Sequence, residues 1–166
     1  MQSQKKRKLL VVLFMLAVLA AAVSSFGDEQ EESPPVEFTG VNVEASSTAD
    51  RDLIKWGVWL TDHGKLINTG LYYTKKKNEA MQYGLDTAIG YLTPVYRVWP
   101  FVQVGVRIGA DTSIKNFHAE AYPKAGIAVP LSSRILMYAD YQYSYSSQGR
   151  HHDYSAASVG FVWGLE

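Results

Sequence analysis

Apolar and polar residues alternate with a period of two along most of the chain after residue 35, and this pattern strongly limits the folds available to it. The clearest run covers residues 101–111, in which the even positions are all aliphatic while the odd ones include Gln103, Arg107 and Asp111. A helix would not sort residues in this way, because its period is 3.6. The pattern therefore predicts strands with one apolar and one polar face.

The same alternation recurs in further segments separated by clusters of polar residues and turn formers. The first segment is the weakest, with apolar residues on both faces, and no helical segment is expected between the runs. The sequence predicts an all-β, antiparallel, up-and-down barrel of about eight strands, which cross a membrane. The other expected strands cover residues 36–45, 54–61, 67–73, 81–91, 117–129, 134–146 and 155–165.

The links between the expected strands also alternate in character. Tight links follow the second, fourth and sixth strands, at residues 62–65, around Thr93-Pro94 and at 130–133. The other links are more polar and mostly longer, and they cover residues 46–52, 75–79, 111–116 and 146–153. Outer-membrane barrels have short periplasmic turns and longer external loops. This order places the tight links in the periplasm.

Two prolines conflict with the expected sixth strand. Pro123 and Pro130 fall within or at the end of this run, and a closed barrel has no free edge on which a proline is easily tolerated. We expect them to interrupt the strand.

The residues of the polar face favour an interior position for that face. Many of them are glycine or serine, which suit the crowded interior of an eight-stranded barrel. Its charged residues carry both signs, as a network of buried ion pairs requires. The expected interior network comprises Lys55, Asp86, Arg107, His118, Glu120, Lys124 and Asp140.

Aromatic residues gather near the ends of the expected strands, where they are typical of the interfaces between membrane and water. This set comprises Tyr72, Tyr73, Tyr91, Tyr96, Trp99, Tyr141, Tyr143, Tyr145 and Trp163.

A soluble barrel with an apolar interior is the alternative, because it would alternate as well. The tripeptide Gly57-Val58-Trp59 resembles the Gly-x-Trp motif of lipocalins. This alternative implies a secreted protein that binds an apolar ligand.

The N-terminus has the composition of a secretory signal peptide. Lys5, Lys6, Arg7 and Lys8 precede an apolar run over residues 9–23, and small residues follow at its end. The run is shorter than the roughly 20 residues of a membrane-spanning helix. We expect cleavage near residues 22–24, so that 1–24 is the signal peptide, 25–35 a flexible acidic lead-in and 36–166 the barrel domain; an uncleaved anchor is the alternative.

Charge and cysteine content exclude several classes of function. Removing the four N-terminal cations leaves 12 basic against 16 acidic residues, a net charge of −4 that gives no support for nucleic-acid binding. The chain has no cysteine, which excludes disulfides, thiolate metal sites and a lipidated cysteine. No cofactor and no metal ion are expected.

The signal peptide, the alternating runs and the order of short and long links resemble the small eight-stranded outer-membrane barrels of the OmpA, OmpX and OmpW type. The resemblance covers residues 36–165 and is architectural. It implies location in the outer membrane, assembly by the barrel insertion machinery and an interior filled by side chains. It implies no single activity, because a fold does not fix a function.

One loop carries residues that resemble catalytic groups. Some small outer-membrane barrels are enzymes that act on lipid A, and His151, His152 and Ser155 are the candidates for such an activity here. Their spacing does not match that of the deacylases, and neighbouring residues on a strand point to opposite faces. We favour a polar external loop without catalysis, and keep the lipid A-modifying enzyme as the alternative.

The expected function is therefore that of a non-enzymatic outer-membrane barrel with a filled interior. Its role would be in envelope integrity or surface contact, with at most a narrow passage for small solutes. The expected partners are outer-membrane lipid and lipopolysaccharide, whose phosphates the basic segment formed by Lys75, Lys76 and Lys77 would contact.

Overall fold

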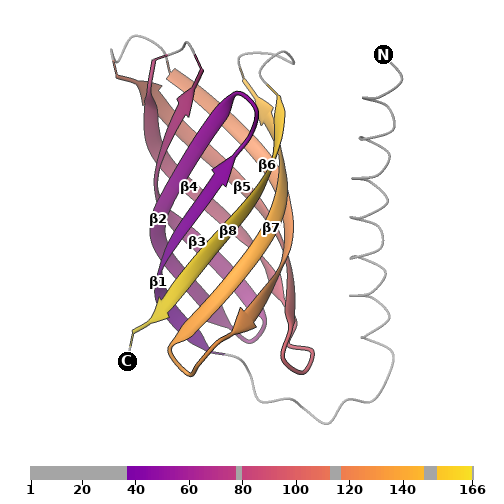
Figure 1. The fold of residues 1–166 in the computed structure, drawn as a ribbon. Helices are drawn as coiled ribbons and strands as arrows, with labels where there is room; N and C mark the ends of the chain where they lie inside the picture. The colour runs from indigo at the N-terminus through magenta and orange to yellow at the C-terminus, as the bar shows by residue number, and fades with distance from the viewer. Residues whose placement is uncertain (1–36, 78–79, 113–116, 148–152, 166) are drawn as a thin grey trace, which may run out of the picture. The chain divides into compact units, whose positions relative to one another are not determined.

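The fold is a closed barrel of eight strands, seen in a computed structural model that describes residues 37–77, 80–112, 117–147 and 153–165. Each strand pairs antiparallel with the next, and β8 pairs with β1 to close the barrel (Figure 1). The predicted up-and-down barrel of eight strands is confirmed. The strands are β1 (Phe38–Ser47), β2 (Arg51–Asp62), β3 (Lys65–Lys76), β4 (Gln82–Leu92), β5 (Trp99–Asp111), β6 (Phe117–Pro130), β7 (Ile135–Ser146) and β8 (Tyr154–Gly164).

Two of the expected segments precede the barrel. The expected signal peptide, 1–24, and the lead-in, 25–35, lie outside the described residues. Within the part of the chain that the structure describes, no helix is both long enough and apolar enough to cross a membrane.

The links between the strands lie at the two opposite ends of the barrel. The turn end holds the links after β2, β4 and β6, and β1 begins and β8 ends there (Figure 1). The loop end holds the links after β1, β3, β5 and β7. At the turn end, His63 and Gly64 form a two-residue hairpin turn in which φ is 49° and 78°. Positive φ at both central residues is the geometry that matches the right-handed twist of the adjoining strands.

Outside the turn end, polar side chains occupy most of the interior, and apolar side chains face outward. In β5, Gln103 and Arg107 are buried, while Val104 and Ile108 are 62% and 58% exposed. A soluble barrel has the reverse arrangement, with its apolar face inside. The exposed aliphatic surface can be stable only if a nonpolar medium covers it.

Two aromatic residues expected at the interfaces lie elsewhere. Tyr72 faces the interior and is buried, and Trp99 is half-buried against the apolar residues inside the turn end. Tyr91, Tyr145 and Trp163 face outward as expected.

Pro123 does not interrupt β6 as expected, whereas the strand does end at Pro130. The strand continues through Pro123, and its pairing with β5 is unbroken there. The ladder to β7 lacks only the pairs of Tyr122 and Pro123, and it resumes at Lys124 in the same register. A proline removes a single N–H donor. One missing donor therefore opens a short gap on one side of the strand instead of breaking it.

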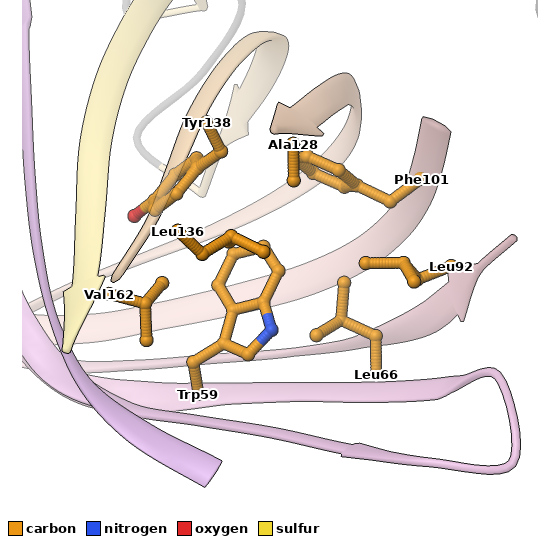
Figure 2. Packing of buried hydrophobic residues seen from close by; sticks show 8 residues of the cluster. All are labelled: Trp59, Leu66, Leu92, Phe101, Ala128, Leu136, Tyr138 and Val162. Atoms are coloured by element: carbon orange, nitrogen blue, oxygen red, sulfur yellow. The ribbon is translucent and has the colours of Figure 1, made fainter. Parts of the chain in front are cut away.

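An apolar plug closes the interior at the turn end. The indole of Trp59 lies at its centre, 5.5 Å from the ring of Phe101 and 4.8 Å from that of Tyr138 (Figure 2). Aliphatic side chains from β3, β4, β7 and β8 surround these rings. The plug comprises Trp59, Leu66, Leu92, Phe101, Ala128, Leu136, Tyr138 and Val162.

Candidate functional site

The charged residues expected on the polar face all lie inside the barrel. They come from β2, β4, β5, β6 and β7, and none has a relative exposure above 6%. Buried charges are stable only when they are paired, so their partners decide what the interior can do. The set is Lys55, Asp86, Arg107, His118, Glu120, Lys124 and Asp140.

Five charged residues form a loop-side cluster: Arg51, Lys55, Asp86, Arg107 and Glu120. The Arg107 guanidinium lies 2.9 Å from Asp86 and 3.0 Å from Glu120, so it joins two carboxylates. Arg51 donates to the other oxygen of Glu120 at 2.9 Å, and Lys55 pairs with the other oxygen of Asp86. The cluster is thus a continuous chain of alternating charges that ties four strands together, β2, β4, β5 and β6.

Tyrosine side chains complete the hydrogen bonding of this cluster. Tyr122 donates to Asp86 at 2.8 Å, and Tyr154 donates to Glu120 at 3.1 Å. The guanidinium of Arg107 also lies 5.1 Å from the ring centroid of Tyr72 and 5.0 Å from that of Tyr122. Aromatic faces attract cations, which offsets part of the cost of burying Arg107.

A turn-side cluster is formed by Glu44, Lys124 and Asp140. The Lys124 ammonium lies 2.8 Å from both oxygens of Glu44 and 3.2 Å from Asp140. Tyr138, a member of the apolar plug, donates to Glu44 at 3.1 Å. This contact connects the ion pairs to the plug below them.

The two clusters balance each other electrically. With ordinary ionisation, the loop-side cluster carries three cations and two anions, and the turn-side cluster carries one cation and two anions. Their formal charges of +1 and −1 cancel. Lys55 lies directly opposite Glu44 in the ladder between β1 and β2, so a cation of the loop-side cluster is adjacent to an anion of the turn-side cluster.

His118 stands apart from the ion pairs. Its Nε2 lies 2.5 Å from the hydroxyl of Tyr72, and the two rings meet edge to face. Its Nδ1 is buried and has no hydrogen-bond partner within the described chain.

Several interior residues were not singled out from the sequence. Glu44 could have been found, because it alternates with Val41, Val43 and Ala45, which face outward. Arg51 was expected in a link, but β2 begins there and buries it. The roles of the tyrosines could not have been found, because the charges they meet come from distant strands.

The other candidate residues lie away from this interior. Lys75 and Lys77 are exposed at the loop end, where Lys76 is half-buried. Ser155 is exposed on the outer face of β8, whereas His151 and His152 lie outside the described residues. The structure therefore brings no described partner of a lipid A-modifying site to Ser155.

One surface group at the turn end has ligand types suited to a metal ion. Single ligand atoms of Glu37, Asp62 and His63 lie within 4.8 Å of one another. All three residues are exposed, and a site open to solvent on this scale holds an ion weakly because water competes for it.

Comparison with known proteins supports the architecture. Neither a scan against protein-family models nor a search of curated proteins finds a match. Among solved structures, the chain is similar to a de novo designed transmembrane β-barrel, with a TM-score of 0.60 and 14% identity over 81% of this chain and 99% of that one. It is also similar to the N-terminal β-barrel domain of Pseudomonas aeruginosa OprF, with a TM-score of 0.57 and 16% identity over 78% of this chain and all of that domain.

These likenesses concern the fold alone, since the identities are low. They agree with the outward apolar surface, and the expected resemblance to small outer-membrane barrels is confirmed at the level of architecture. The chain is an eight-stranded antiparallel transmembrane β-barrel whose interior is occupied by balanced ion pairs and an apolar plug.

Proposed function

We propose that this chain is a closed, non-enzymatic barrel of the outer membrane that contributes to envelope integrity or surface contact. The observation that carries the proposal is the filled interior. The two charged clusters occupy the loop-end and middle parts, and Trp59, Phe101 and Tyr138 occupy the turn end (Figure 2). Eight strands leave room for side chains but not for a wide channel.

The proposed location is the outer membrane, reached by export with a cleaved signal peptide and insertion by the barrel assembly machinery. The acyl-facing band of aliphatic residues and the outward Tyr91, Tyr145 and Trp163 support membrane insertion. In this orientation the turn end faces the periplasm and the loop end faces outward.

The basic segment at the loop end would then lie near lipopolysaccharide. Lys75 and Lys77 are exposed, and the backbone of Lys77 is held by a hydrogen bond from its N–H to the carbonyl of Asp50 at 2.8 Å. Ammonium groups are common partners of phosphates. We propose that this segment contacts lipopolysaccharide phosphates.

Conductance across a planar bilayer tests the closed state. Protein purified from membranes of cells expressing the full chain should give no steady open-channel current. Replacing the plug rings together, by Trp59→Ala and Phe101→Ala, should produce measurable leak, whereas Trp163→Ala and Phe161→Ala on the outer face should not. A stable current through the unaltered protein would overturn the proposal of a closed barrel.

A further inference from the structure

A hollow lies on the outer face of the barrel beside the gap in the ladder between β6 and β7. It has a volume of about 500 Å³ and is lined almost entirely by carbon atoms from β4, β5, β6 and β7. Its lining residues include Ala121 and Pro123, both on β6. The hollow therefore occupies the surface that faces the membrane.

The register of the strands explains the shape of the hollow. Ala121 lies between Val106 on β5 and Tyr145 on β7, since it is paired with both. Pro123 is paired with Val104, and on its other side the pair with β7 is missing. The small floor residues are thus flanked by larger side chains that rise on either side.

The gap adds a second feature at the same place. Tyr122 and Pro123 lack the pairs with β7 that the rest of the ladder would predict. A proline has no N–H to donate, so the backbone hydrogen bond that would join β6 to β7 at this point is missing. The hollow therefore lies where the backbone pairing of β6 with β7 is interrupted.

The chemistry of the lining selects the occupant. None of the described residues that line the hollow is charged, and its walls continue into the outward aliphatic residues of β4 and β5, such as Leu85 and Ile108. A peptide or a polar headgroup would leave its hydrogen-bonding groups unsatisfied here. The medium already in contact with this surface of a transmembrane barrel is the acyl region of the bilayer.

We propose that this hollow is a binding site for one acyl chain of a membrane lipid. The chain lies over Ala121 and Pro123, between the aliphatic wall of β5 and Tyr145. Because it fills a concave site, it remains bound longer than the lipids that touch the convex outer surface elsewhere.

Photolabelling in a bilayer tests this site. The protein, purified from membranes after expression of the full chain, is reconstituted with phospholipid that carries a diazirine on one acyl chain. After irradiation, mass spectrometry of the peptides locates the label. We expect about tenfold more label per exposed area at the hollow than at Val43 or Ile54, equivalent to about 1.4 kcal/mol of preferential binding. Label spread in proportion to exposed area would overturn the proposal.

Two variants and a control connect the label to the hollow. Ala121→Phe fills the floor, and Tyr145→Ala removes one wall, so each should reduce the label at the hollow to the level found elsewhere. Ala45→Phe introduces the same ring on the outer face of β1 and should leave the label unchanged. Unaltered labelling in both hollow variants would overturn the proposal. The heat-dependent gel shift of each variant verifies its fold.

Discussion

At the scale of residues, Asp86 is the interior carboxylate that joins side chains from three other strands. It is fully buried, and it accepts hydrogen bonds from Lys55 on β2, Arg107 on β5 and Tyr122 on β6. Arg107 keeps Glu120 as a second carboxylate partner, whereas Lys55 forms its ion pair with Asp86 and has Glu44 only as its opposite neighbour in the ladder between β1 and β2. Removing the charge of Asp86 would therefore leave one buried ammonium without its paired anion.

We expect Asp86→Asn to lower the free energy of unfolding by about 3 kcal/mol, the cost typical of breaking a buried ion pair from one side. Urea titration in lipid vesicles, followed by tryptophan fluorescence, measures the change. Asp62→Asn is the control, since Asp62 is exposed at the turn end, and it should change stability by less than about 0.5 kcal/mol. Equal effects of the two variants would show that the Asp86 ion pairs do not stabilise the barrel.

Much of the interior at this scale could be predicted, because alternation decides which residues share a face. Lys124 and Asp86 were placed on the polar face in this way. Their partners could not be predicted, since Lys124 meets Glu44 across 80 positions of sequence. Alternation gives the direction of a side chain, but the closure and tilt of the barrel decide which side chains meet.

At the scale of elements, β6 shows how much a strand tolerates when its neighbours fix its register. The sequence indicated that Pro123 would interrupt the strand, yet pairs on both sides of the gap keep one register with β7. The ladder to β5 is complete at Pro123. The missing donor therefore faces β7, and only that seam is weakened. Propensity alone predicted a break because it takes no account of the two flanking ladders.

Pro123→Ala should close this seam by restoring the missing N–H donor. We expect amide hydrogen exchange at Tyr143 and Tyr145 on β7, whose amides point toward β6, to slow by about fivefold, as one added backbone hydrogen bond of about 1 kcal/mol would produce. Exchange measured by nuclear magnetic resonance in micelles detects the difference. Pro130→Ala, at the end of the same strand, is the control and should leave these amides unchanged. Slow exchange at both residues in the unaltered protein would contradict the weakened seam.

At the scale of the whole molecule, two opposite requirements are met by one alternating pattern. The outward positions satisfy a nonpolar medium, while the inward positions satisfy one another through balanced charges and a plug. Closure between β1 and β8 leaves no strand edge exposed, which the interior of a membrane demands. Unfolding must therefore open the ladder cooperatively, and for this reason we expect the folded barrel to resist detergent.

Cell fractionation and gel migration test that behaviour for the full chain expressed in Gram-negative cells. We expect the protein in the outer-membrane fraction, with an unheated band that migrates differently from the heated one. Val159→Arg places a cation in the middle of the outward face of β8, and it should reduce the shifted band because a cation near the bilayer midplane costs about 2–4 kcal/mol. Ser47→Arg, at the loop end of β1, is the control and should keep the full yield. Recovery in the soluble fraction, or equal yields of the two variants, would mean that the outward face of β8 does not contact lipid.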